Sequence, residues 1–224
     1  MGKSAKSRIT YNYEPGITLN EEQLRAKEII NNNKLTILTG RAGSGKSLLA
    51  VEAALNLLSK KELGYEKIII TRPYVTTEEY GLLPGTLSDK VAPNYEVIKN
   101  LFYEVIKKDK VDAMISDGDI EILSVGFCRG ATFKKAIIIN DEAQNFTAKQ
   151  TLLLLTRLGK GSKMIFTLDA DQIDIKPNQS CVAFLRTLTQ TEGVGSFELK
   201  QNHRDPLVRL VIEKYAEYIK QDSK

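Results

Sequence analysis

The residue types best suited to chemistry are first concentrated in the stretch Gly40–Ser47, which reads G-R-A-G-S-G-K-S. This spacing matches the pattern G-x-x-x-x-G-K-[ST] of phosphate-binding (Walker A) loops. Glycine backbone N–H groups can close on phosphate oxygens without a Cβ in the way, Lys46 can reach the β- and γ-phosphates, and Ser47 can ligate Mg²⁺. We therefore expect a magnesium–nucleoside triphosphate site whose nucleotide-binding residues are Gly40, Arg41, Ala42, Gly43, Ser44, Gly45, Lys46, Ser47 and Leu48.

A second candidate group is the apolar run Ile137-Ile-Ile-Asn that ends in the adjacent carboxylates Asp141 and Glu142. At the tip of a strand, Asp141 can hold the Mg²⁺ water shell opposite Ser47, and Glu142 can polarise the attacking water. The alternative is a solvated strand end without a role. The position after a phosphate-binding loop, with Ala143-Gln-Asn145 following, favours a hydrolytic site.

The elements that must position these residues follow from the hydrophobic pattern. An apolar run at 35–39 precedes the loop, and apolar residues at helical spacing follow it at 48–58. Further strands are expected at 67–71, 120–125, 136–140, 163–168 and 196–200, and further helices at 17–30, 94–108, 147–158, 182–189 and 206–219. Residues 75–93 have weak periodicity and are expected to form a long functional loop. Alternating strands and helices predict an α/β fold with a mostly parallel sheet covered by helices on both faces.

Length and composition limit the remaining possibilities. The 224 residues predict a single domain over residues 17–224, preceded by a basic, flexible tail at 1–16. Two cysteines at no metal-ligand spacing favour reduced thiols in the cytoplasm, and no apolar run is long enough to cross a membrane. A single histidine, His203, leaves no basis for a histidine metal cluster or a histidine-based triad. The net charge of +4 permits contact with nucleic acid without demonstrating it.

Six separated motifs, in this order, closely resemble the PhoH-like family. The resemblance covers about residues 17–219, and it implies a cytoplasmic ATPase with a RecA-like P-loop NTPase fold and suspected links to RNA metabolism. The motifs are Gly40–Ser47, Arg72-Pro73, Leu83-Pro-Gly85, Asp141-Glu-Ala-Gln-Asn145, Gly161-Ser-Lys-Met164 followed by Asp169 and Asp171-Gln172, and Arg204 before Pro206-Leu-Val208.

The same residues are similar to the first motor domain of superfamily 1 helicases, and this likeness implies three further roles. Gln23 would read adenine, although an ordinary polar helix residue is the alternative. Gln172 would sense the γ-phosphate. Arg204 would be an arginine finger that acts in cis or on a neighbouring subunit.

The sequence also departs from the family pattern. Leu168 stands where the family usually has glycine, which would restrict the sensor loop, and Asn140 replaces an apolar residue before Asp141. His203 replaces an apolar residue near the arginine, and we expect it to be structural. Coupling of hydrolysis to movement is therefore less supported than ATP binding.

These features lead to one main expectation and two alternatives. The main one is an Mg²⁺-dependent ATPase in which Lys46, Glu142, Gln172 and Arg204 act on ATP, while Ser47 and Asp141 hold the metal. Its polymer partner would be single-stranded nucleic acid, with RNA favoured, contacted by Arg72 and the 75–93 loop. One chain supplies only half of a two-domain motor, so a homo-oligomer is expected, with a ring such as a hexamer favoured. The alternatives are an ATP-dependent assembly switch with little turnover and a kinase, which the Asp141-Glu-Ala-Gln144 signature disfavours.

Overall fold

The fold is built on a six-stranded sheet in which all the strands run parallel, in the order β3-β2-β4-β5-β1-β6. The structure is a computed structural model, and it describes residues 13–73 and 87–222. The strands are β1 (Leu35–Gly40), β2 (Lys67–Thr71), β3 (Ile120–Leu123), β4 (Ala136–Asn140), β5 (Lys163–Leu168) and β6 (Val194–Leu199). The predicted α/β class and parallel sheet are confirmed.

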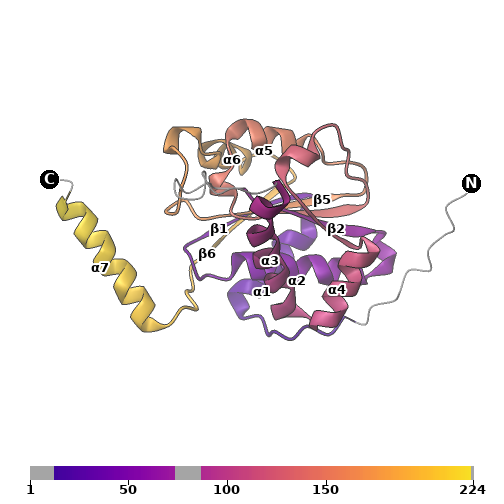
Figure 1. Ribbon diagram of the computed structural model, residues 1–224, viewed down its shortest axis with the longest axis horizontal. Helices are drawn as coiled ribbons and strands as arrows, with labels where there is room; N and C mark the ends of the chain where they lie inside the picture. Colours follow the sequence, from indigo (N-terminus) through magenta and orange to yellow (C-terminus); the bar gives the residue numbers. More distant parts are fainter. Residues whose placement is uncertain (1–12, 74–86, 223–224) are drawn as a thin grey trace, which may run out of the picture.

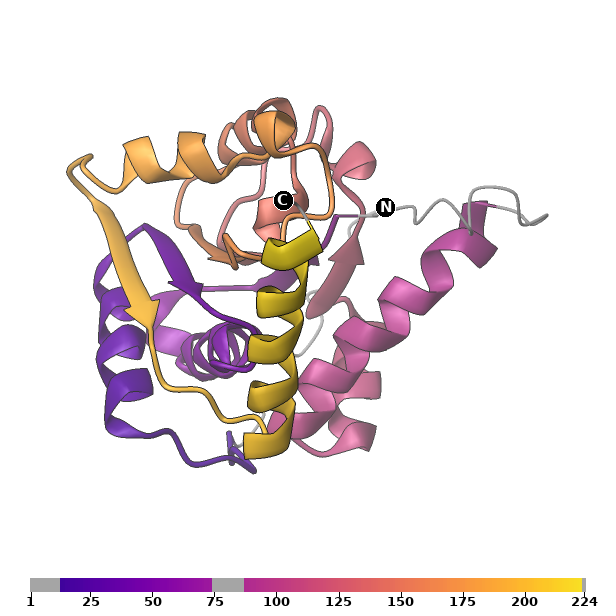
Figure 2. The ribbon, with the colours of Figure 1, turned by 90° about the vertical axis from the view of Figure 1, so that its left-hand side faces the viewer.

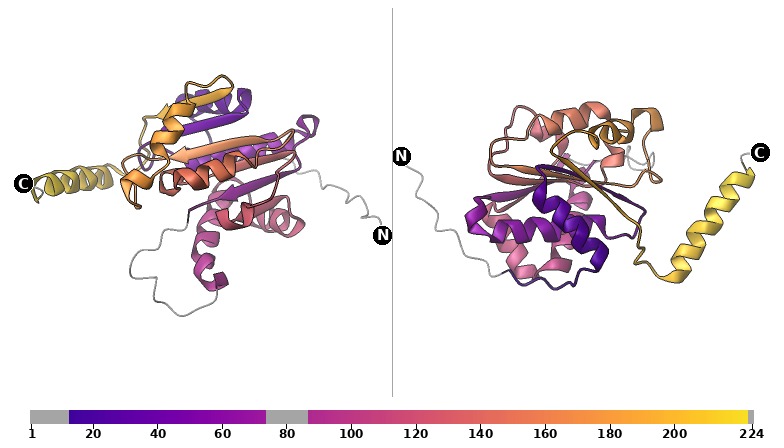
Figure 3. Two further views of the ribbon diagram at one scale, coloured as in Figure 1. Left: turned by 90° about the horizontal axis from the view of Figure 1, so that it is seen from above. Right: turned by 180° about the vertical axis from the view of Figure 1, so that it is seen from behind.

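Helices cover the sheet on both faces, as predicted (Figure 1). One face packs against α1 (Glu21–Asn32), α2 (Lys46–Ser59), α3 (Leu87–Val105) and α4 (Lys108–Asp117), and Figure 2 shows β6 lying alongside α1. The other face packs against α5 (Ala148–Leu155) and α6 (Val182–Leu188). The last helix, α7 (Pro206–Asp222), extends away from both layers (Figures 1 and 3).

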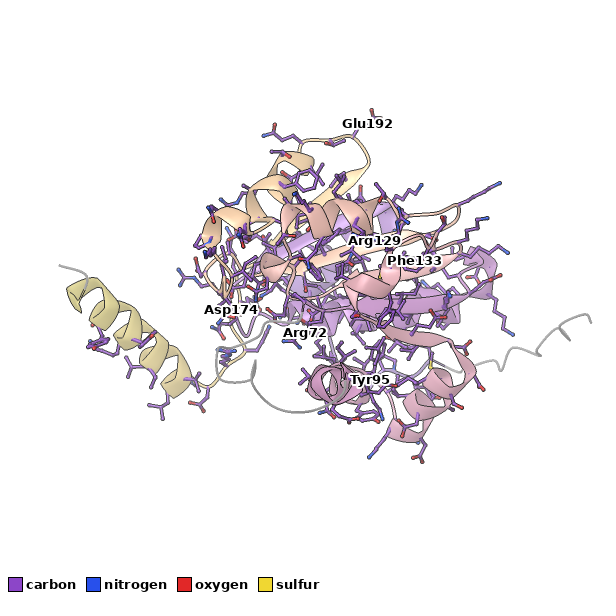
Figure 4. The ribbon with its side chains drawn as sticks, turned by 45° about the horizontal axis from the view of Figure 1, so that its top comes forward. Arg72, Tyr95, Arg129, Phe133, Asp174 and Glu192 are labelled. Carbon is purple, nitrogen blue, oxygen red and sulfur yellow. The ribbon has the colours of Figure 1, made fainter. Side chains whose placement is uncertain are left out.

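The central strands are mostly apolar because both of their faces are covered. Every residue of β4 and β5 is buried, and Asn140 at the end of β4 pairs with Phe166 of β5. Since parallel strands all end at one edge of the sheet, the segments that follow β1, β2, β4 and β5 meet there. In Figure 4, Arg72, which follows β2, and Asp174, beyond β5, lie toward this end of the molecule, away from Phe133, which precedes β4.

On the α1–α4 side of the sheet, one predicted helix start was wrong and one helix was missed. The helix expected at 94–108 begins at Leu87, so residues 87–93 of the predicted 75–93 loop are helical, with Pro93 inside α3. The loop was predicted from the weak periodicity of residues 75–93, which hid the helical start of α3. The chain then forms α4, which the sequence analysis missed and which ends at the left-handed Gly118. Residues 74–86, with most of the predicted loop and the Leu83-Pro-Gly85 motif, lie outside the described residues.

The start of the domain is held by a buried carboxylate. Residues 1–12 of the predicted tail lie outside the described residues, but Tyr13 donates its hydroxyl to Glu52 Oε1 of α2 at 2.6 Å. Lys27 of α1 donates to the same oxygen, also at 2.6 Å. Burial, followed by this bond to Glu52, raises the pKa of Tyr13, so the tyrosine stays a neutral donor. Packed structure therefore extends at least to Tyr13, ahead of the predicted boundary at residue 17.

A buried lysine closes the C-terminal end of α1, where the last turn has no basic residue of its own. Lys163, at the start of β5 and 5% exposed, donates to the carbonyls of Ile30, Asn31 and Asn33. We expect Lys163→Met to lower the free energy of unfolding by about 2 kcal/mol, because methionine fills the space but leaves those carbonyls without a donor.

Urea unfolding of the parent chain and the Lys163→Met variant measures this difference. The matched control is Lys160→Met, at an exposed position a few residues earlier, which should change stability by less than about 0.5 kcal/mol. Equal effects of the two substitutions would show that the α1 carbonyls do not depend on Lys163.

Candidate functional site

The predicted phosphate-binding loop joins the end of β1 to the start of α2, as the sequence analysis expected. Gly45 is the N-cap of α2 in the left-handed conformation, with φ of 81°. At Gly40, φ is 150°, and a Cβ would lie 2.4 Å from the carbonyl oxygen of Leu199. Only glycine fits this position, so the loop is held against the end of β6. The backbone N–H groups at the start of α2 are left for an anion.

Lys46 is 8% exposed, and its ammonium group stays inside the loop. Its Nζ donates to the carbonyl of Gly40 at 2.7 Å and to that of Arg41 at 3.1 Å. Burial lowers the pKa of Lys46, while the nearby carboxylates, Asp169 first among them, act in the opposite direction. A buried cation at a helix N-terminus makes the local potential positive, so an anion such as phosphate is stabilised there.

Ser47 and Asp141 come together although ninety-four positions separate them, as the prediction of a shared metal site requires. Ser47 Oγ donates to Asp141 Oδ1 at 2.6 Å, and Thr167 Oγ1 of β5 donates to the same oxygen at 2.7 Å. A hydroxyl and a carboxylate are hard oxygen donors that suit Mg²⁺. Within the described part of the chain, no group of three or more His, Cys, Asp or Glu residues could hold a metal ion by itself. The donor set thus fits an ion whose other ligands are phosphate oxygens and water.

Glu142 follows Asp141 and stands in the left-handed region, with φ of 52° and ψ of 41°. Such a conformation costs a non-glycine residue of the order of 1 kcal/mol, so its neighbours must hold it. Gln144 Nε2 donates to Glu142 Oε2 at 2.6 Å, and Arg72 Nη2 lies 3.7 Å from Glu142 Oε1. Arg72 Nη1 lies equally far from Asp141 Oδ2. The carboxylate is therefore fixed at one oxygen and faces an arginine with the other.

Gln144 and Asn145 connect the carboxylate segment to the loop after β5. Gln144 is 1% exposed, and its Oε1 accepts the backbone N–H of Asp169 at 3.0 Å while its Nε2 holds Glu142. Asn145 donates to Asp174 Oδ2 and accepts the Asp174 backbone N–H, each at 2.7 Å. The base candidate and the predicted sensor loop therefore form one hydrogen-bonded unit.

Gln172, the predicted sensor, lies on this loop. Its backbone N–H donates to the Asp169 carbonyl at 3.2 Å, and its side chain is exposed. Two residues that depart from the family pattern, Asn140 before the carboxylates and Leu168 before the loop, are both buried. Leu168 is 3% exposed, and Asn140 accepts the Thr71 hydroxyl at 2.8 Å. Leu168 is therefore a core residue here, and the role of Gln172 stays a prediction.

Gln23, the predicted adenine reader, lies beside the loop but is partly engaged. It is 8% exposed, and its Nε2 lies 2.8 Å from where a Cβ on Gly45 would be. Its Oε1 accepts the backbone N–H of Asn20 at 3.1 Å, which closes the capping box of α1. Gln23 therefore closes a capping box beside the loop, and its adenine role stays a prediction.

The segment after β6 returns to the chain's own phosphate-binding loop. His203 N donates to the Gly43 carbonyl at 2.9 Å, and a Cβ on Gly43 would lie 2.5 Å from Arg204 Cγ. The guanidinium of Arg204 also contributes to lowering the pKa of Lys46. Arg204 therefore lies beside the phosphate-binding loop of its own chain. Asn20 Nδ2 lies 3.3 Å from His203 Nε2, in keeping with a structural histidine.

Two groups that position the site were missed by sequence reasoning. Thr167 is an ordinary strand residue in the pattern, and its contact with Asp141 depends on the pairing of β4 with β5. Gln144 was noted as part of a motif, but its two partners could not be derived from spacing. A signal for both exists only in the strand order, which places β5 between β4 and β1.

Comparison with known proteins gives the family. The family model for PhoH-like proteins matches residues 17–216. A PhoH-like protein of Bacillus subtilis is 38% identical over 218 residues, which cover 91% of this chain and 68% of the relative. A PhoH-like protein of Mycobacterium leprae is 37% identical (92% of this chain, 59% of the relative), and the protein PhoH of Escherichia coli is 30% identical (96% and 62%). The chain thus spans about three fifths to two thirds of their length.

Among solved structures, the large terminase of a thermophilic bacteriophage aligns with a TM-score of 0.53 at 9% identity, covering 81% of this chain and 46% of the terminase. At such low identity the likeness concerns the fold alone, and it agrees with an α/β RecA-like P-loop NTPase domain. The match of the family model over most of the chain, together with these relatives, makes the chain a member of the PhoH-like protein family.

Proposed function

We propose that this domain binds ATP with Mg²⁺ and hydrolyses it. The observation that carries the proposal is the 2.6 Å contact between Ser47 of the phosphate-binding loop and Asp141 at the tip of β4, with Glu142 next in the chain. A passive phosphate site needs the loop alone. A carboxylate at the metal position followed by a second, braced carboxylate is what water activation requires.

The chain's residues divide the work. Lys46 and the start of α2 bind the β- and γ-phosphates, and Ser47 with Asp141 would hold Mg²⁺, which when bound offsets charge on the phosphate oxygens. Glu142 accepts a proton from the water that attacks the γ-phosphorus as the bond to the ADP oxygen breaks. The aliphatic part of the Arg204 side chain packs against Gly43, and its guanidinium supplies positive charge to the γ-phosphoryl group in cis. Gln23 would orient adenine, and Gln172 would respond to the γ-phosphate from its loop.

We further propose that turnover is coupled to single-stranded nucleic acid, RNA in preference to DNA, in a cytoplasmic homo-oligomer. Family membership supports this, as does Arg72, which is 24% exposed in its side chain, close to both carboxylates and at the edge where parallel strands end. None of the described helices is long and apolar enough to cross a membrane. The rival proposal is a switch in which ATP occupancy controls assembly and turnover is incidental.

Steady-state phosphate release separates these proposals. It is measured with ATP and Mg²⁺, with EDTA in place of Mg²⁺, and with added single-stranded RNA, single-stranded DNA or duplex. We expect turnover that needs Mg²⁺ and rises with a single strand, most with RNA. Negligible release in every condition would favour the switch. Release that no strand changes would leave an ATPase without the proposed polymer partner.

Gln144 should act as a positioning residue for Glu142, and this yields a prediction. We expect Gln144→Met to lower kcat about 10-fold to 100-fold with little change in KM, because Glu142 loses the donor that fixes it while the phosphate contacts stay. The matched control is Asn145→Leu, which loosens the loop at Asp174 but leaves Glu142 held. An equal fall in kcat for both variants would mean that Gln144 acts only by bracing the loop.

A further inference from the structure

The last helix, α7, is formed by its own sequence. Asp205 accepts the backbone N–H of Leu207 at 2.8 Å, as an N-cap does, and Pro206 occupies the first helical position. From there the helix runs outward, away from the sheet and its two helical layers (Figures 1 and 3). The local signals therefore explain why residues 206–222 are helical but not what stabilises them.

The described side chains of α7 expose an apolar surface. Its large apolar residues are 42–66% exposed, and Leu207, Val211, Tyr215 and Tyr218 recur at the four- and three-residue spacing of one helix face. Lone helices of this length are marginal in water, and most helical stability in proteins comes from packing an amphipathic face. Among the α7 residues whose side chains the structure describes, the exposed apolar ones are Leu207, Val208, Leu210, Val211, Tyr215 and Tyr218.

The domain does not need α7 to complete its core. Both clusters of buried apolar residues in the described structure draw on the sheet and on α1–α6, and their last member in the chain is Leu199. If the core needed α7, a face of the sheet would lie uncovered without it. Both faces are covered by other helices, so the apolar surface of α7 is free to bind another partner.

The start of α7 is fixed beside the phosphate-binding loop. The Glu22 carboxylate accepts the backbone N–H groups of Lys200 and Gln201 at 2.9 and 3.0 Å. His203 N donates to the Gly43 carbonyl. The segment 200–203 that precedes α7 is held to the domain by these hydrogen bonds. The helix therefore starts from a fixed point and is not joined through a free linker.

We propose that α7 is the assembly element of this protein and docks on a second copy of the chain. Six large apolar side chains at about half exposure present on the order of 600 Å², at the upper end of what a monomer usually leaves uncovered. If each copy covers the α7 of another, two such contacts bury on the order of 2,000 Å² in total, the range of stable homodimer interfaces. A second copy is the partner because a closed symmetric assembly brings the α7 of one copy to the next, and so covers every α7 without another protein.

This inference gives a surface to the proposed homo-oligomer and does not depend on hydrolysis. The test is light scattering after size-exclusion chromatography on the full chain, the Tyr215→Glu variant, and the control Lys214→Gln. Both substitutions lower the net charge by one, and both are on exposed positions of α7, but only the first enters the apolar face. We expect the parent and the control to assemble and Tyr215→Glu to shift to monomers, with a dissociation constant at least 100-fold higher.

Hydrogen exchange in α7 and thermal unfolding of the domain complete the test. Protection of α7 in the parent should disappear when dilution separates the copies. At a concentration at which the parent and Tyr215→Glu are both monomeric, the two melting temperatures should be the same. A monomeric parent with a protected α7, or an assembly that Tyr215→Glu leaves intact, overturns the proposal. So does a parent that stays monomeric and binds lipid vesicles or another protein through α7. Absence of ATP turnover in a chain that still assembles through α7 would refute the proposed function alone.

Discussion

Replacing Glu142 by glutamine should reduce ATP turnover by about 10²-fold to 10⁴-fold, the usual contribution of a positioned general base. Glutamine has the same size and can keep a contact with Gln144 after its amide turns, but it cannot take a proton from water. Ser47, Asp141 and Lys46 are unchanged, so the affinity for Mg²⁺ and ATP should stay within about 3-fold of that of the parent. Phosphate release and an equilibrium nucleotide titration measure the two quantities.

The matched control is Glu121→Gln on β3, where the carboxylate binds Lys67 at 2.8 Å far along the sheet from the loop. Its turnover should match that of the parent. If Glu142→Gln turns over ATP normally, Glu142 is not the base, and the strained backbone at that residue would need another explanation.

Replacing Lys46 by methionine should weaken ATP binding by about 10²-fold or more, because hydrogen bonds from a charged donor to phosphate contribute about 1.5–3 kcal/mol each. The buried ammonium lies among Asp169, Glu142 and Asp141, and without a cation there those carboxylates would repel the phosphates. Calorimetric titration with ATP and Mg²⁺ measures the change.

Stability separates a binding effect from a folding effect at Lys46. Burial disfavours the charged lysine, as its lowered pKa indicates, and this offsets the loss of its bonds to the Gly40 and Arg41 carbonyls. Lys46→Met should therefore change the melting temperature little. The control Lys60→Met, at the exposed C-cap of α2, should leave both binding and stability unchanged. A variant that binds ATP as tightly as the parent would contradict the assignment of the loop to the phosphates.

The central part of the site could be predicted from sequence because its signals are local. The glycine pattern, Lys46 and Ser47 lie within one turn between a strand and a helix, and Asp141 with Glu142 ends an apolar strand. Parallel strands end at one edge, which is enough to bring Ser47 and Asp141 together. The 2.6 Å contact between them confirms that expectation.

The supporting contacts could not be predicted because they depend on partners distant in sequence. Gln144 reaches Asp169, and Thr167 reaches Asp141, only because β5 lies next to β4. Gln23 is predicted to read adenine, and its carbonyl oxygen also closes a capping box with Asn20. The capping pattern and the nucleotide motif use the same residue type, so the sequence could not separate them.

Some helix ends are likewise set by local residues, and others depend on tertiary packing. Gly118 gives α4 a left-handed C-cap, a local signal that could have revealed the helix, whereas Pro93 inside α3 contradicts the usual boundary rule. The proline at the first turn of α7 correctly indicated where this helix starts. No pattern could indicate that this helix would extend away from its own domain, since apolar periodicity says that a face is covered but not by what.

The claim that this site hydrolyses ATP is tested most directly by identifying the nucleotide that the protein holds after one turnover. The chain is mixed in excess over ATP with Mg²⁺, the reaction is quenched, and ATP, ADP and phosphate are quantified. We predict that the parent converts its bound ATP to ADP and phosphate, while Glu142→Gln retains intact ATP over the same time. Bound ATP that stays intact in the parent, with or without single-stranded RNA, would contradict the account.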